Sequence, residues 1–163
     1  MDPFTAMLVS FGYLGAFASG FLSTFTVFIP SPTFIVVSIL AATHQFNPLL
    51  LGVVGGAGAA IGEFIGYFVG YGAGMSAHKW KRIKWSYWRK KIDFLFKKYH
   101  PDVVIFVLAA LPVVPFDVAG IFCGAVRYDI KRFTVAMTLG KILKYVVLAY
   151  AGFYGVDFIM GLF

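Results

Sequence analysis

Charged side chains are scarce in this sequence, and basic ones are missing from its first 78 residues. Asp, Glu, Lys and Arg make up 13% of the 163 residues, whereas a water-soluble domain carries about 25%. All 14 Lys and Arg lie at or beyond Lys79. The chain therefore lacks the polar surface of a soluble globular protein, and its length limits it to one domain.

Metal ligands and catalytic motifs are also sparse. Cys123 is the single cysteine, which excludes an internal disulfide and a cysteine metal site and predicts a buried, inert thiol. His44, His78 and His100 are scattered and show no HExxH spacing. No serine occupies a nucleophile elbow, and no glycine loop is followed by Lys-Ser or Lys-Thr. We therefore expect no enzyme, no bound metal and no cofactor.

Long apolar runs take the place of these groups. Hydrophobic residues make up 60% of the chain. Between Pro48 and Ala77 the only formal charge is Glu63, and this run exceeds the roughly 20 residues that cross the hydrocarbon core of a bilayer. The sequence predicts an all-α integral membrane protein. Residues 1–6 resemble a vector-derived leader with Met7 as the natural start, and we expect no cleaved signal peptide.

Two basic clusters predict the topology. Nine Lys and Arg lie within residues 79–98. The second cluster consists of Arg127, Lys131 and Arg132. Because basic loops stay in the cytoplasm, both clusters are expected on the cytoplasmic side of the cell membrane. Residues 101–126 must then leave and return to one face. Pro112 and Pro115 break this segment into arms of about 10 residues, or about 15 Å each, which predicts a re-entrant hairpin.

The N-terminal half follows the same plan. An apolar arm at residues 7–29 is followed by a proline break at 30–34, which contains Pro30 and Pro32. A short second arm at 35–43, a turn at 44–48 and a long helix at 48–74 come next. The first arm is long enough to cross the membrane fully, so a spanning helix is the alternative to a hairpin arm there.

A shift of about 80 residues superimposes the two halves. The matched pairs include Pro30 with Pro112, Asn47 with Asp129 and, after a gap, Glu63 with Lys141. Each copy would be a hairpin followed by one spanning helix, so the copies have opposite orientations, which is the inverted-repeat plan of many transporters. We expect one membrane domain with repeats at about 8–76 and 100–156.

The linker between the repeats, at about 79–99, predicts an interfacial helix. Trp85 and Trp88 begin an apolar face at helical spacing, with Lys and Arg opposite. A basic amphipathic helix with aromatic residues suits the headgroup layer and attracts anionic lipid. Nucleic acid is not expected as a partner. Before the linker, a glycine recurs every four residues, which predicts close helix packing. These glycines are Gly58, Gly62, Gly66, Gly70 and Gly74.

Four ionisable residues are predicted deep in the membrane, where such groups are costly and mark functional sites. They are Glu63, Asp117, Lys141 and Lys144. A structural ion pair between Glu63 and Lys141 is the alternative to a transport or binding role. Lys144 could instead extend toward the headgroups. The basic residues at 127–132 are interpreted as topology determinants that can contact a headgroup.

The return arms of the two hairpins would point their helix N-termini at the membrane midplane. Thr33 or Ser31 could cap the first and Asp117 the second. Free N–H groups and the positive dipole end, together with Lys141 and Lys144, suit an anion such as a phosphate. Glu63 would balance a lysine when the site is empty, or carry a proton.

Two motifs resemble the DedA family, whose members carry the VTT domain and are also known as SNARE-associated Golgi proteins. The first reads Gly58-x-x-x-Gly62-Glu63-x-x-x-Tyr67-x-x-Gly70-x-x-x-Gly74. The second reads Leu111-Pro112-x-x-Pro115-Phe116-Asp117-x-x-Gly120, with Gly124 and Arg132-Phe133 after it. The resemblance covers about residues 30–152. It departs from the family pattern at Thr33-Phe34 and Gly70-Tyr71, and an arginine usual in the second hairpin has no counterpart. Lys141 and Lys144 are a hypothetical replacement for that positive charge.

The resemblance implies two facing re-entrant hairpins and transport of lipid. Members of the family are implicated in flipping undecaprenyl phosphate or phospholipids, and some in proton-dependent processes. We therefore expect a translocase for a phosphate-bearing membrane lipid, with protons as a further candidate partner. The alternatives are a proton-coupled carrier of small ions or drugs and a non-transporting scaffold that recruits partners. Two spanning helices enclose little volume, which favours a homodimer.

Overall fold

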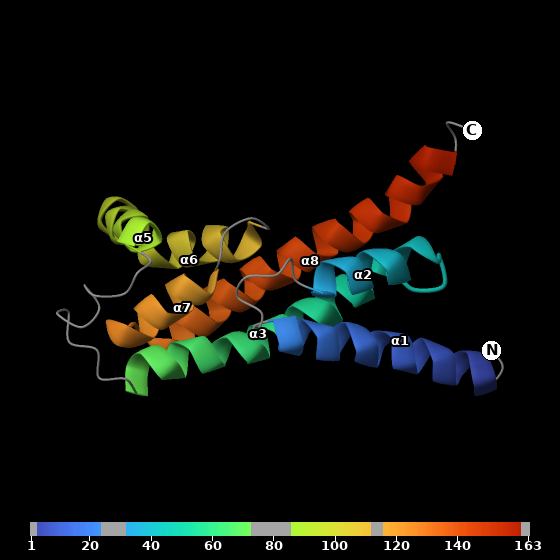
Figure 1. The fold of residues 1–163 in the computed structure, drawn as a ribbon, viewed down its shortest axis with the longest axis horizontal. Helices are drawn as coiled ribbons and strands as arrows, with labels where there is room; N and C mark the ends of the chain where they lie inside the picture. Colours follow the sequence, from blue (N-terminus) through green and yellow to red (C-terminus); the bar gives the residue numbers. More distant parts are fainter. Residues whose placement is uncertain (1–2, 24–31, 73–85, 112–115, 161–163) are drawn as a thin grey trace. The chain divides into compact units, whose positions relative to one another are not determined.

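The structure is a computed structural model that describes residues 3–23, 32–72, 86–111 and 116–160. Helices form its elements, and no strand occurs within those ranges. In chain order they are α1 (Pro3–Leu22), α2 (Pro32–Ala42), α3 (Pro48–Gly72), α5 (Ser86–Lys98), α6 (Pro101–Ala110), α7 (Phe116–Ala125) and α8 (Ile130–Met160) (Figure 1). The predicted all-α class is confirmed for this part of the chain.

Two helices among the described residues are long and apolar enough to cross a membrane. They are Pro48–Gly72, which is all of α3, and Ile130–Gly155 in α8. At about 1.5 Å per residue, 25 residues extend about 38 Å, more than the hydrocarbon core of about 30 Å. The 10 residues of α6 and the 10 of α7 reach only about 15 Å each. The breaks at 24–31 and 112–115, which contain most of the predicted hairpin prolines, lie outside the described residues.

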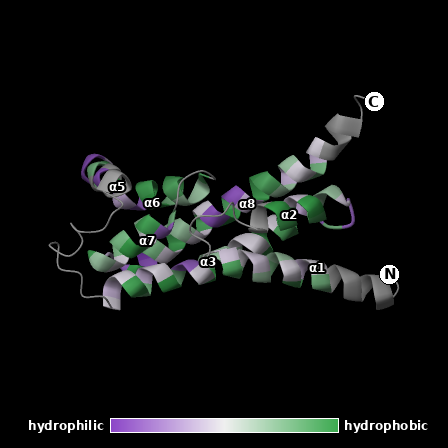
Figure 2. Ribbon diagram, viewed as in Figure 1, coloured by the Kyte–Doolittle hydropathy of each residue, from purple (hydrophilic) through white to green (hydrophobic). Residues whose placement is uncertain are grey.

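The basic linker forms a helix, as predicted. The described part, α5, begins at Ser86 and ends in Lys97 and Lys98. Hydrophilic residues are concentrated on it, whereas α6 and α7 are largely apolar (Figure 2). Ile92 is buried, and the ring of Phe96 lies 5.2 Å from that of Phe122 on α7. One face of the helix therefore packs against the protein.

Both long helices begin in the same way. Asn47 accepts hydrogen bonds at its side-chain oxygen from the N–H groups of Leu49 (2.9 Å) and Leu50 (3.3 Å), and so caps α3. Asp129 accepts one from the N–H of Arg132 (2.9 Å) and caps α8. A residue with a left-handed backbone precedes each cap, His44 with φ 56° and Arg127 with φ 53°. The repeat alignment matches Asn47 with Asp129, and each of these residues caps the long helix that follows it.

The described helices pack into two compact units, and both long helices contribute a part to each. Unit 1 comprises residues 1–62 and 141–163, and unit 2 comprises residues 63–140. Unit 1 thus holds α1, α2, the part of α3 up to Gly62 and the part of α8 from Lys141 onward. Unit 2 holds α5, α6, α7 and the remaining parts of α3 and α8.

Unit 1 contains close backbone contacts at glycine residues. A Cβ atom on Gly58 would lie 2.2 Å from the backbone oxygen of Phe17, so α1 and α3 are in backbone contact. On α8, Gly152 approaches the backbone oxygen of Ser38 on α2 in the same way, at 2.6 Å. Such close approach is the packing device that substitutes for the hydrophobic effect in lipid.

Unit 2 has its own aromatic core on α3, α7 and α8. Phe133 is fully buried, and its ring centroid lies 4.9 Å from that of Tyr67 and 6.3 Å from that of Phe116. Next to this core, Gly70 presses on α7, because a Cβ atom there would lie 2.1 Å from the backbone oxygen of Ile121. The predicted packing role is therefore confirmed for Gly58 and Gly70, whereas Gly74 lies outside the described residues.

Candidate functional site

Glu63 is the most deeply buried charged residue in the described part of unit 2, with 1% of its surface exposed. It lies on α3 directly after Gly62 and three residues before Gly66. Its Oε1 atom lies against α7, since a Cβ atom built on Gly120 would be 3.1 Å from it and one on Gly66 3.7 Å. Helix α7 therefore forms one wall around this carboxylate.

Asp117 belongs to the same neighbourhood. α7 begins at Phe116, so Asp117 lies in the first helical turn. There its charge interacts favourably with the positive end of the helix dipole. Its backbone oxygen and Oε1 of Glu63 are both within 4 Å of a Cβ atom built on Gly66. The backbone of Asp117 therefore lies close to the Glu63 carboxylate within unit 2.

We expect Gly120→Ala to disturb this carboxylate without unfolding the protein. The new Cβ would lie 3.1 Å from a movable side-chain oxygen, so Glu63 would shift by a few tenths of an ångström. If the carboxylate takes part in transport, the initial rate should fall by about threefold to tenfold, because small misplacements of working groups are costly. Gly66→Ala is the matched control, since its Cβ would make an ordinary contact of 3.7 Å with the same oxygen. Thermal midpoints and transport rates of both variants test this, and equal rates would contradict it.

Lys141 and Lys144 belong to unit 1, at the start of the part of α8 that this unit contains. Lys141 is 5% exposed and Lys144 is 9% exposed. The Nζ atom of Lys144 lies 5.3 Å from the centroid of the Tyr145 ring, a distance typical of a cation–π contact. Lys141 lies 11 residues after the start of α8 at Ile130, or about 16 Å along the helix. It is therefore near half the depth of a bilayer if α8 spans.

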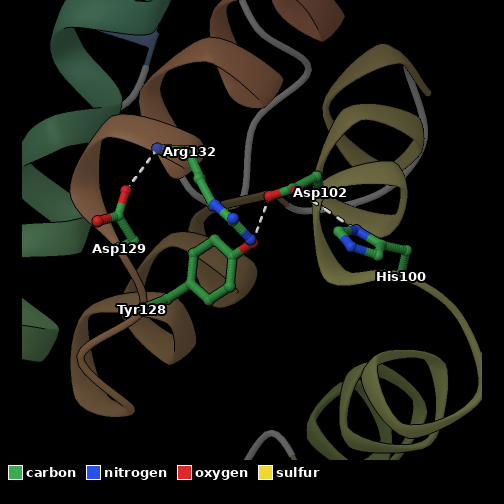
Figure 3. A network of polar contacts seen from close by, with 5 residues as sticks. All are labelled: His100, Asp102, Tyr128, Asp129 and Arg132. Atoms are coloured by element: carbon green, nitrogen blue, oxygen red, sulfur yellow. Dashed lines mark hydrogen bonds and ion pairs between the residues drawn. The ribbon is translucent and has the colours of Figure 1, made fainter.

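A polar network around the turn between α7 and α8 was not predicted from the sequence. Figure 3 shows Tyr128, in the turn before α8, donating its hydroxyl to Oδ1 of Asp102 on α6. Nδ1 of His100 lies 3.2 Å from Oδ2 of the same carboxylate. Tyr67 of α3 donates its hydroxyl to the backbone oxygen of Tyr128 at 2.6 Å. These contacts join the start of α6, the α7–α8 turn and α3 within unit 2.

The hydroxyl of Tyr128 should ionise late in an alkaline titration. Burial, then the hydrogen bond to Asp102 and the charge of that carboxylate, raise the pKa of Tyr128 to about 12. Its ordinary value is 10.0. Because the folded pKa is above the unfolded one, the group stabilises the fold below pH 10 and loses this contribution as the pH rises toward 12. Tyrosinate absorbance of wild type minus Tyr128→Phe should show a midpoint near 12, and a midpoint near 10 would contradict the contact.

Five predicted site residues lie outside the described residues: Ser31, Pro30, Pro112, Pro115 and Trp85. Three others are described by their backbone alone: Pro32, the first residue of α2, Thr33, which follows it, and Trp88 in α5. Arg127 is placed: its guanidinium carbon lies 5.4 Å from the centroid of the Tyr71 ring. Lys131 and Arg132 are exposed in the first turn of α8. Within the described ranges, no group of three or more His, Cys, Asp or Glu could hold a metal ion.

The sequence matches the profile of the VTT domain over residues 29–154. That range contains α2, α3, α5, α6 and α7 and most of α8. No curated protein sequence and no solved structure gives a match. The family is one of membrane proteins and is generally regarded as non-enzymatic, in line with the two long apolar helices. From the breadth of this match, the chain belongs to the VTT-domain family, which is the DedA or SNARE-associated Golgi family.

Proposed function

We propose that this protein translocates a phosphate-bearing lipid, such as a polyprenyl phosphate or a phospholipid, across the cell membrane. The observation that carries the proposal is the burial of Glu63, Lys141 and Lys144 along α3 and α8. Charged groups within spanning helices are costly and mark substrate or ion pathways. Helices that only anchored the protein in the membrane would not need three buried charged residues.

The two lysines are assigned to the headgroup. A lysine ammonium binds phosphate oxygens as a compact charge with three donors. Lys141 is the primary contact in this proposal, because it lies near half the length of the spanning part of α8, and Lys144 is one turn further along. Hydrophilic stretches interrupt the otherwise apolar ribbon of α8 (Figure 2).

The carboxylates are assigned to gating or proton transfer. Glu63 packs against the first turns of α7, where Asp117 also lies. A carboxyl group in such a place can hold or release a proton while the headgroup passes. This role makes protons a second partner and predicts that a pH gradient changes the rate.

The proposed architecture is an inverted repeat with re-entrant hairpins. It is supported by the equivalent caps at Asn47 and Asp129 and by the shortness of α6 and α7. In this arrangement the basic segments 79–98 and 127–132 lie on the cytoplasmic side. A homodimer would supply the protein volume that two spanning helices lack.

Reconstitution of the purified protein tests the function directly. Proteoliposomes would carry short-chain polyprenyl phosphates or headgroup-labelled phospholipids, with and without a pH gradient. We expect protein-dependent movement of at least one phosphate-bearing lipid. Absence of movement for all of them, with protein that is folded by size-exclusion chromatography, would overturn the proposal. Gradient-driven flux of ions or drugs without lipid movement would instead establish the carrier alternative.

A further inference from the structure

A groove between α6 and α8 in unit 2 has the build of a lipid-binding site. Its volume is about 520 Å³, within the roughly 300–1,000 Å³ of small-molecule sites. The walls are apolar and come from Val103 and Phe106 on α6 and from Val135, Ala136 and Leu139 on α8. Lys131, Arg132 and Asp102 line the remainder. The groove is therefore apolar along most of its length and charged at one end.

The charged end of this groove, which we call its mouth, lies where both helices begin. α6 starts at Pro101 and α8 at Ile130, so both helices run from the mouth into the apolar part. Leu139 lies eight residues beyond Lys131, or about 12 Å deeper along α8. At the far end the helices touch, because a Cβ atom on Gly140 would lie 2.5 Å from the backbone oxygen of Phe106. A lipid has the same order of groups, with a charged head at the interface and a chain pointing inward.

The electrostatics of the mouth favour an anion. Lys131 and Arg132 are exposed side chains in the first turn of α8, and two helix N-termini add their positive dipole ends. The carboxylate of Asp102 opposes them, but it accepts the hydroxyl of Tyr128 and lies 3.2 Å from Nδ1 of His100. Both oxygens of this carboxylate therefore already have polar neighbours within unit 2 (Figure 3).

A second groove provides an internal contrast. It lies between α2 and α8 in unit 1, has a volume of about 280 Å³ and is lined by apolar residues and Ser38. No charged side chain is among its lining residues. Of these two grooves, only the α6–α8 groove combines an apolar interior with a basic mouth.

We propose that the α6–α8 groove binds one membrane lipid with an anionic phosphate headgroup. Lys131 and Arg132 hold the phosphate, and one acyl or prenyl chain lies along Val103, Val135 and Leu139. This site is on the surface of unit 2 and does not depend on translocation. A protein that moves no lipid would still bind one here.

Photocrosslinking tests the site with a lipid of known composition. The full-length protein would be placed in phosphatidylcholine nanodiscs that contain phosphatidylglycerol with a diazirine in one acyl chain. We expect labelling of peptides that contain residues 103–106 and 135–139. Lys131→Ala or Arg132→Ala should reduce this labelling by about fivefold each, the effect of one cation near an anionic lipid. Lys98→Ala is the control, because it removes an exposed charge from α5 without lining the groove, and its labelling should equal that of wild type.

Two further substitutions test whether the groove itself, rather than general damage to the protein, determines the labelling. Asp102→Asn keeps an acceptor for Tyr128 and removes the opposing charge, so labelling should rise. Val135→Trp should fill the channel and abolish labelling there, whereas Val147→Trp, at another exposed position of α8, should not. Equal labelling by a phosphatidylcholine probe, or loss of labelling in Asp102→Asn, would overturn the proposal. So would undiminished labelling in Lys131→Ala and Arg132→Ala.

Discussion

Gly124→Ala is expected to prevent unit 2 from folding. A Cβ atom at this position would lie 1.9 Å from the backbone oxygen of Tyr67 and 2.9 Å from the backbone nitrogen of Tyr71. Backbone atoms cannot rotate away as a side chain can, so α7 would have to move off α3. Overpacking in a core lowers the free energy of unfolding by about 1–3 kcal/mol and occasionally more. Because the new Cβ would clash with backbone atoms, we expect a loss at or above the upper end of this range.

The measurement is the thermal midpoint of purified protein, followed by size-exclusion chromatography in detergent. For a protein of this size, about 3 kcal/mol corresponds to a fall of more than about 6 °C, and we expect at least that or no folded protein. Gly72→Ala is the matched control on α3, because no atom lies within 4 Å of its added Cβ. A Gly124→Ala variant that melts with wild type would show that α3 and α7 are not in backbone contact.

Neutralising Glu63 or Lys141 is expected to slow transport strongly while leaving a folded protein. Glu63→Gln keeps the shape of the side chain and removes its charge, and Lys141→Ala removes the ammonium assigned to the headgroup. General acid–base or charge-binding groups in a working site contribute about 10²-fold or more to rate. We expect initial rates in proteoliposomes to fall at least about tenfold in each variant.

The control must separate a working charge from a structural one. Lys98→Gln removes an exposed charge from α5 and should leave the rate unchanged. If Glu63 and Lys141 only stabilise the fold as an ion pair, each variant would lower the thermal midpoint and the surviving folded protein would transport normally. That result would refute the transport role of these residues. Reduced rate at an unchanged midpoint would support it.

Much of the helical plan could be read from the sequence because its signals are local. Asn47 and Asp129 are capping residues at the points where apolar runs begin, and each caps a long helix. The four-residue spacing of Gly58 and Gly70 predicted close packing correctly. Proline breaks placed the starts of α2 and α7 within a few residues. Periodicity alone could not show which helix each face meets, since these helices are apolar on all sides.

The contacts that sequence reasoning missed are long-range. Asp102 gave no signal, because one acidic residue near the start of a short helix is common, and its hydroxyl partner Tyr128 is 26 residues away. The α6–α8 groove was missed for the same reason. Lys131 and Arg132 were interpreted as topology determinants, and only the placement of α6 beside α8 shows an apolar channel below them. Chain-distant pairings of this kind need the three-dimensional structure.

The division into units has a consequence for biosynthesis. Unit 2 is continuous in the chain, from Glu63 to Gly140, whereas unit 1 combines the first 62 residues with the last 23. As the ribosome releases the chain from its N-terminus, every residue of unit 2 is available before unit 1 is complete. Until the last part of α8 has been synthesised, α2 lacks the surface that Gly152 presents to Ser38. Unit 2 can therefore assemble before unit 1 is complete.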